Sequence, residues 1–287
     1  MRDLDNRKPP VVVGIDGSQA AIQAAEWAVA EAVGRQVPLL LTYVISEHAE
    51  PAPFASVGNE RMEHEYGETA LRIAAAAVEA VGEPVKVETV ILRGEPTNQL
   101  VAKSRNAAMI CIGSTGIGRV AKLFLGSTAT DLAEAAHCSV AIIRSQRGQH
   151  VLGRSLIAVA VEDRPGDEIV VKQAIEEAGR RHIPLLALGT WRREVEEMAA
   201  DELGRRMQLW RSRYPGVEVH TASTGTDVAD FLAVIDRRIE LTVLGSNDTN
   251  QIARLIGPHR HPVLGNAECS VLIARPSGAD IGDAPCG

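Results

Sequence analysis

The chain has 287 residues, 45% of them hydrophobic but only 3% aromatic, which suits two ordinary globular domains with aliphatic cores. Its formal net charge of -7 opposes a phosphate backbone, and the scarcity of aromatic rings leaves no platform for stacked bases, so we expect no nucleic-acid partner. The charged N-terminus and the lack of a membrane-length apolar run predict a cytoplasmic protein without a membrane partner.

The first half of the chain alternates short apolar runs with helical stretches. An apolar run from Val11 to Ile15 is followed by a helical stretch at residues 20–33 and a second apolar run at 38–44. A long helix is expected at 67–81, and further strands at 85–92, 107–112 and 138–144. Short apolar strands separated by helices predict a parallel sheet with helices on both faces, which is a doubly wound α/β domain.

The second half repeats this order at a nearly fixed spacing. Pro184 minus Pro38 is 146, and Glu162 minus Asp16 is also 146, so the first strand, helix and second strand match in length. The motif Cys-Ser-Val opens the last strand of both copies. We therefore predict two tandem doubly wound domains, each with a five-stranded parallel sheet, at residues 9–146 and 153–276, flanked by flexible tails at 1–8 and 277–287.

A glycine-rich segment between residues 113 and 128 is the strongest functional signal. It leaves an expected strand and enters an expected helix near Ser127 or Thr128. Glycines let backbone N–H groups approach an anion, and a helix N-terminus adds unpaired donors, so anion binding is favoured over an ordinary turn. In doubly wound sheets, ligands bind beyond the strand ends where the strand order reverses. Asp16, Val44 and Gly113 are expected at that point.

Two general phosphate-binding patterns fit this segment poorly. A Walker A loop needs Lys-Ser/Thr where this chain has Arg119 and Val120. Gly116, Gly118 and Ala121 satisfy the loose dinucleotide pattern, but that pattern belongs after the first strand and should open a helix at once. Neither pattern therefore explains the segment.

A third pattern matches it residue by residue. Gly113, Gly116 and Gly126-Ser127 have the spacing Gly, two residues, Gly, nine residues, Gly-Ser, which resembles the nucleotide-binding signature of the universal stress protein family. The Asp-Gly-Ser turn at Asp16 and the strand ending in Val44 are also similar to that family, and the resemblance covers both copies. It implies an adenine nucleotide alpha hydrolase-like fold and ATP, with or without Mg, as the ligand.

The same resemblance divides the ATP site between two groups of residues. It implies nucleoside contacts by Ile15, Asp16 and Val44, and triphosphate contacts by Gly113, Thr115, Gly116, Gly126, Ser127 and Thr128. Chemistry supports Asp16 independently, because a carboxylate at a strand end can accept hydrogen bonds from both hydroxyls of a ribose. The alternative role for Asp16 is to cap the helix that follows.

The C-terminal copy carries residues that oppose a triphosphate. The Asp-Gly-Ser turn becomes Glu162-Asp-Arg, and Asp248 stands in the place of Gly116. Pro258, which has no N–H to donate, stands opposite Ser127. We therefore predict a degenerate copy that does not bind ATP.

Together these features predict an ATP-binding stress-response regulator or interaction module. The alternative is a scaffold of the same type that binds proteins but no nucleotide. No catalytic arrangement or metal-ligand set is evident, so we expect no enzyme activity beyond slow ATP hydrolysis through a metal at Asp16. The last strands, at residues 140–144 and 271–275, are expected sheet edges, which predict a protein partner, an internal pseudo-dimer or further self-association to a dimer.

Overall fold

The computed structural model describes residues 8–46, 57–114, 127–144, 155–161, 166–190, 196–226, 228–234, 239–248 and 269–276. The chain divides into two compact units, residues 1–145 and residues 146–287.

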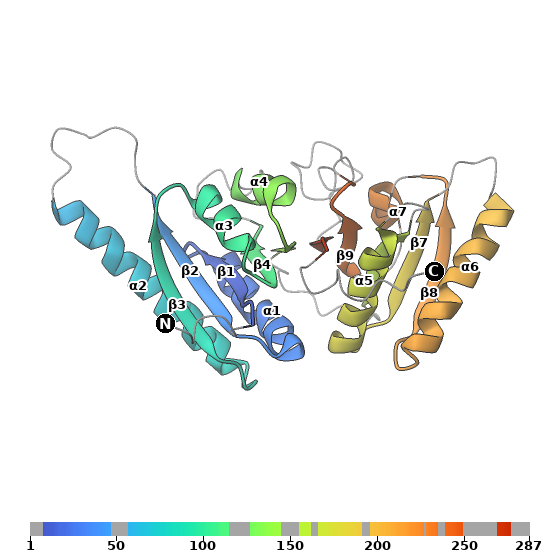
Figure 1. Cartoon of the computed structure of the whole chain (residues 1–287), viewed down its shortest axis with the longest axis horizontal. Coiled ribbons are helices and arrows are strands. Elements are labelled where there is room, and N and C mark those ends of the chain that lie inside the picture. The colour runs from blue at the N-terminus through green and yellow to red at the C-terminus, as the bar shows by residue number, and fades with distance from the viewer. Residues whose placement is uncertain are drawn as a thin grey trace. The chain divides into compact units, whose positions relative to one another are not determined.

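The N-terminal unit is a five-stranded parallel sheet with helices on both faces (Figure 1). Its strand order is β3-β2-β1-β4-β5, so the order reverses between β1 and β4. Helices α1 and α2 pack together on one face, and α3 and α4 on the other. The strands are β1 (Val11–Ile15), β2 (Leu39–Ile45), β3 (Val87–Arg93), β4 (Met109–Gly113) and β5 (Ser139–Ile143). The helices are α1 (Gln19–Arg35), α2 (Val57–Ala80), α3 (Pro96–Ser104) and α4 (Ser127–Ala135).

The C-terminal unit has the same architecture. Its strand order is β10-β9-β6-β7-β8, and the paired strands are parallel. The strands are β6 (Leu156–Val161), β7 (Leu185–Thr190), β8 (Val219–Thr224), β9 (Ile239–Gly245) and β10 (Ser270–Ala274). The helices are α5 (Asp167–Arg181), α6 (Glu196–Arg213) and α7 (Val228–Val234). The predicted fold class, two tandem doubly wound domains, is confirmed.

The predicted spacing of 146 residues is found at the C-terminus of the first helix in each unit. Gln36 is the C-cap of α1 and His182 is the C-cap of α5, both with a left-handed φ of 55°, and 182 minus 36 is 146. The N–H of Gln36 donates to the carbonyls of residues 32 and 33, and that of His182 to residues 178 and 179. The two halves therefore share both register and helix termination.

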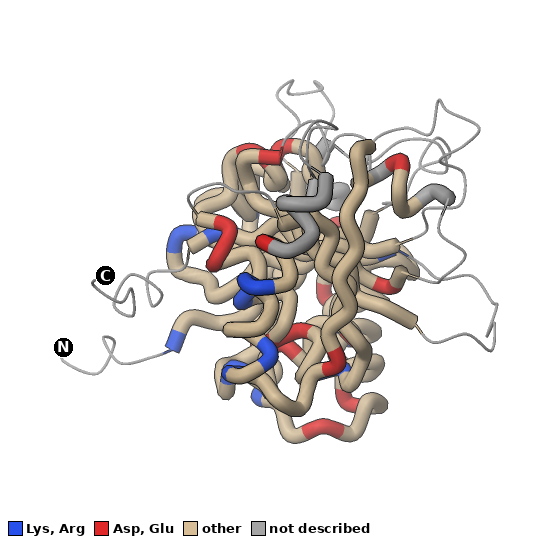
Figure 2. The backbone as a smooth tube through the Cα atoms, turned by 90° about the vertical axis from the view of Figure 1, so that its right-hand side faces the viewer, with Lys and Arg blue, Asp and Glu red and all other residues tan. Residues whose placement is uncertain are grey.

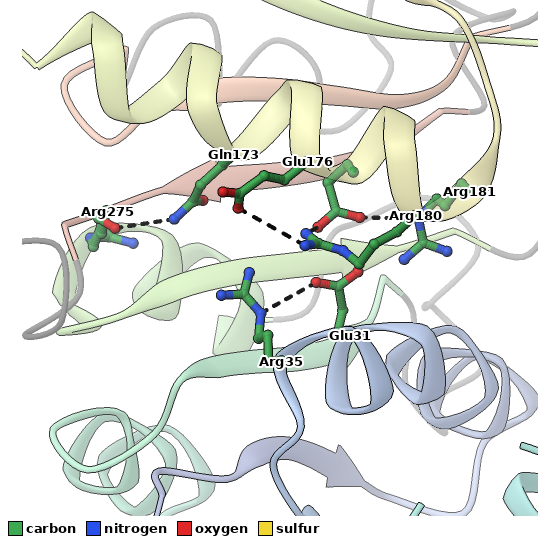
Figure 3. Close-up of polar contacts among 8 residues, drawn as sticks. Glu31, Arg35, Gln173, Glu176, Arg180, Arg181 and Arg275 are labelled. Atoms are coloured by element: carbon green, nitrogen blue, oxygen red, sulfur yellow. Dashed lines mark hydrogen bonds and ion pairs between the residues drawn. The ribbon is translucent and has the colours of Figure 1, made fainter. Parts of the chain in front are cut away.

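A buried ion pair is repeated at the same spacing. Glu31 on α1 and Glu177 on α5 are both fully buried. Each lies against an arginine four residues later: Arg35 Nε is 3.5 Å from Glu31 Oε2, and Arg181 Nε is 3.1 Å from Glu177 Oε2 (Figure 3). Arg180 adds a second partner to Glu177. Burying a carboxylate is costly unless it is paired, so these arginines belong to the helix scaffold in both copies.

The core consists of aliphatic strands covered by alanine-rich helix faces. Strands β1, β4 and β5 contain no Lys, Arg, Asp or Glu, and charged residues lie mainly on helices and loops (Figure 2). Cys111, Cys138 and Cys269 are buried, as expected for small core residues.

Helix α2 begins earlier than the sequence predicts. We expected residues 67–81, and the helix starts at Val57. Its first turns carry many charges and few apolar residues, so apolar periodicity does not reveal them. A local pair, Arg61 to Glu65 at 2.9 Å, supports this exposed part of the helix instead.

Candidate functional site

The turn after β1 is held by two side-chain hydrogen bonds. Asp16 Oδ1 accepts the N–H of Ser18 at 2.9 Å, and Ser18 Oγ accepts the N–H of Ala21 at 3.1 Å. Gly17 between them has a φ of 84°, which glycine adopts at little cost. The N-cap of α1 is therefore Ser18 and not Asp16, and only one carboxylate oxygen of Asp16 is engaged in the turn.

The end of β4 packs directly against the start of α1. A Cβ atom placed on Gly113 would lie 2.6 Å from the backbone carbonyl carbon of Ala20, which is closer than any side chain tolerates. The next residue, Ser114, is buried and donates its N–H to the carbonyl of Ile143 on β5 at 2.8 Å. Residues 113 and 114 are thus fixed between α1 and β5.

A cavity of about 280 Å³ lies beyond the carboxyl ends of β1, β2 and β4, where the strand order reverses. Five of the nine predicted site residues line it: Ile15, Asp16, Val44, Gly113 and Thr128. They come from three strand ends and the first turn of α4. The predicted nucleoside residues and two predicted phosphate residues therefore share one cavity.

The described part of the chain does not include the side chains of the other four predicted residues. Thr115, Gly116 and Gly126 lie outside the described residues. Ser127 is the first residue of α4, but its side chain is not described. The binding roles of all nine residues stay predictions.

Several cavity residues were missed by sequence reasoning. Pro96 and Leu100 of α3 form an apolar wall, and Thr42 on β2 lies two residues before Val44. Only Thr42 had a visible signal, because it is a polar residue within the apolar run of β2 and shares the strand face of Val44. The contribution of α3 depends on the packing of that helix over β1 and β2 and has no local signature.

At two helix N-termini beside the cavity, a side chain of the chain itself already accepts a hydrogen bond from a backbone N–H group. Ser18 caps α1, and Glu95 caps α3 by accepting the N–H of Asn98 at 2.7 Å. Partial burial raises the pKa of the Glu95 carboxyl, but hydrogen bonds from backbone N–H groups outweigh this and hold the pKa below its ordinary value. Its negative charge offsets the α3 dipole. The start of α4, where Thr128 lies, is a third helix N-terminus at this cavity.

Tyr43 contributes a neutral phenol to the cavity wall. Burial raises its pKa, and the neighbouring Tyr66, Glu63 and Asp16 raise it further. Its ring lies over Gly67 of α2, where a Cβ would approach Cδ1 to 2.7 Å. Tyr43 is therefore held by α2 and presents no charge to a ligand.

The described residues contain no group of three His, Cys, Asp or Glu side chains arranged to hold a metal ion. Within the same part of the chain, no helix is both long and apolar enough to cross a membrane.

The corresponding strand end in the C-terminal unit is arranged differently. The N–H of Gly245, at the end of β9, donates to Asp248 Oδ2 at 3.0 Å, and the N–H of Asp248 donates to the Gly245 carbonyl at 3.1 Å. The N–H group at this strand end therefore already donates a hydrogen bond to a carboxylate of the chain itself. Glu162 and Pro258, the other substitutions noted above, lie outside the described residues.

Two doubly wound α/β domains in tandem, with a cavity at the strand-order reversal of the N-terminal one, define a class of tandem α/β proteins. The family model described as "Universal stress protein family" matches residues 9–144 and 154–275. The chain belongs to the universal stress protein family.

A relative supports this assignment, and a solved structure has a similar fold. A universal stress protein of Mycobacterium tuberculosis is 47% identical over 266 residues, 92% of this chain and 96% of its own. The crystal structure of a universal stress protein from Archaeoglobus fulgidus covers 95% of this chain and 98% of its own, with a TM-score of 0.67 at 16% identity. A universal stress protein crystallised in complex with cAMP covers 48% of this chain at 22% identity, with a TM-score of 0.39.

Proposed function

We propose that the N-terminal unit binds ATP in the cavity at the ends of β1, β2 and β4, and that the protein acts as a nucleotide-responsive regulator or interaction module in the stress response. One observation carries the proposal: five residues that the sequence predicts as nucleotide contacts line a single cavity at the strand-order reversal.

The chemistry of the cavity suits an adenine nucleotide lying across it. Pro96, Leu100 and Ile112 give apolar surface for a flat base beside Val44. Asp16 keeps its second carboxylate oxygen for a ribose hydroxyl, because only Oδ1 is used by the turn. The phosphates would extend toward Thr128 and the N-terminus of α4. A divalent cation, if bound, would arrive with the phosphates and supply charge neutralisation there.

The C-terminal unit takes no triphosphate under this proposal. Asp248 already accepts the strand-end N–H that an anion would need, and its charge repels a phosphate. Any response to nucleotide would therefore originate in the N-terminal unit alone.

Retained nucleotide is the direct test. The purified protein is denatured and its supernatant analysed for ATP, and equilibrium dialysis of nucleotide-free protein then compares ATP, AMP and NAD. We expect ATP to be retained or to bind most tightly. A protein that binds none of the three would instead be the nucleotide-free scaffold, and preference for NAD would indicate a dinucleotide-dependent enzyme.

Asp16→Asn separates the role in the turn from the role in the site. Asparagine still accepts the N–H of Ser18 but lacks the charge and the second carboxylate acceptor. We expect the ATP affinity to fall about tenfold, the scale of a lost charge-assisted hydrogen bond, with an unchanged melting temperature. Asp248→Asn in the C-terminal unit is the matched control and should leave ATP affinity unchanged. Equal affinities for Asp16→Asn and the parent protein would rule out the ribose contact.

A further inference from the structure

A buried hydroxyl group lies on the floor of the cavity without a hydrogen-bond partner. Thr42 lines the cavity and is 1% exposed. Its Oγ1 is buried and makes no hydrogen bond within the described part of the chain. Folded proteins rarely leave a buried hydroxyl unpaired, because the group loses its water without compensation. Valine would fill the same volume at this position without that cost.

Strand register places Thr42 in the deepest row of the cavity. Thr42 pairs with Gly14 on β1. A Cβ on Gly14 would lie 3.1 Å from Ile112 Cγ2 and 3.2 Å from Leu100 Cδ1, so these side chains meet above the glycine on the same face of the sheet. Because strand side chains alternate, Val44 lies one row nearer the mouth on the face of Thr42. The floor is therefore apolar apart from Thr42.

We propose that Thr42 is a specificity-determining residue of the nucleotide site, in which its hydroxyl hydrogen-bonds to the polar edge of the nucleobase. The inference rests on the proposed nucleotide function. The base is the one part of a nucleotide that combines flat apolar faces with polar edges, so it suits a floor that joins Leu100 and Ile112 to one hydroxyl. A hydroxyl can donate to a ring nitrogen or accept from an amino group. Ribose and phosphates remain at the polar mouth, near Asp16 and Thr128.

The test compares three variants with the parent protein, using ATP and AMP as probes. Thr42→Val removes the hydroxyl and keeps the shape, Thr42→Ser keeps the hydroxyl, and Thr89→Val makes the same change at an exposed position of β3 outside the cavity. We expect Thr42→Val to weaken ATP and AMP by a similar factor, about five- to tenfold. Thr42→Ser should stay within about twofold of the parent protein, and Thr89→Val should match it.

The nucleotide-free melting temperature separates a ligand contact from a structural role. Thr42→Val removes an unpaired buried hydroxyl, so its melting temperature should equal or exceed that of the parent protein. A lower melting temperature, an unchanged ATP affinity, or a loss confined to ATP and absent for AMP would each overturn the assignment of Thr42 to the base. If the parent protein binds neither probe, the proposed function fails and this inference fails with it; if it binds both and Thr42→Val binds equally, only the inference fails.

Discussion

The ends of β4 and β9 are equivalent in the duplication and are used in different ways. Gly113 ends β4 against the backbone of Ala20, beside an open cavity. Gly245 ends β9 with its N–H donated to Asp248, in a motif that otherwise keeps the Gly-Ser start. The two units share strand register and the way their first helices end. In the C-terminal unit, the strand-end N–H is hydrogen-bonded within the chain. Duplication thus retained the fold in both units, while the contacts of the two strand-end glycines diverged.

The first helices of the two units show the same divergence. Helix α1 is capped by the neutral hydroxyl of Ser18, and its first turn has no acidic residue. Helix α5 begins after Gly166, which makes no side-chain cap, and its first turn carries Asp167 and Glu168. These carboxylates complement the α5 dipole directly and oppose a bound phosphate. The first helices of the two units therefore differ in the charge at their N-termini.

The largest expected difference between the two units is in their tolerance of a methyl group at the strand end. Gly113→Ala would place Cβ 2.6 Å from the Ala20 backbone, which cannot move without shifting α1. We expect a loss of roughly 3 kcal/mol in unfolding free energy, or about 6–12 °C in melting temperature. Among the described residues, Gly245→Ala meets only Asp248 Oδ2 at 3.2 Å and Val170 at 3.4 Å, so it should cost less than about 1 kcal/mol.

Calorimetry on both alanine variants makes this comparison. Equal melting temperatures for the two would show that the close packing of β4 on α1 does not distinguish the units. A loss of ATP binding by Gly113→Ala would carry no information about the site, because the fold itself is affected.

The sequence predicted which strand ends meet at the cavity but not which side chains of α3 and β2 form its walls. Asp16 and Val44 follow or end apolar runs, and the doubly wound rule then places them together. Gly113 was interpreted only as an anion-binding glycine, whereas its contact with Ala20 is a packing requirement that holds without any ligand. Leu100 reaches the cavity through the packing of α3 over Gly14, and only a three-dimensional register can show this. Side-chain alternation could have shown that Thr42 shares the strand face of Val44. The sequence could not show that its hydroxyl has no hydrogen-bond partner among the described residues.

The repeated buried ion pair offers a second test, on a feature that both units share. Glu177→Ala would take the carboxylate away from both Arg180 and Arg181, and we expect a cost of about 2–3 kcal/mol. Glu31→Ala takes it away from Arg35, whose Nε is buried, so a similar cost of about 2–3 kcal/mol is expected.

Urea unfolding followed by circular dichroism measures both losses, with the exposed Glu83→Ala as the control that should change little. A negligible loss in either variant would show that the buried ion pair does not stabilise that unit.

The smallest expected effect is a pH dependence at the start of α3. Glu95 caps this helix, and its pKa is lower in the folded state than its ordinary value. The ionised cap therefore stabilises the fold above that ordinary value, and the stabilisation is lost as the pH falls through the lowered pKa. Because the carboxyl is exposed, Glu95→Gln should cost no more than about 0.5 kcal/mol near pH 7.

Melting curves of Glu95→Gln and the parent protein, recorded from pH 7 downward, measure this effect. The difference between them should shrink toward zero in the acidic range, because the parent protein then loses the same charge. A difference that stays constant with pH would show that the Glu95 charge contributes nothing to the cap. Asp227 directly precedes α7 in the C-terminal unit but lies outside the described residues, so Asp227→Asn extends the comparison. If its melting temperature follows the same pH profile, an acidic side chain at this position stabilises both units; a flat profile would limit the effect to Glu95.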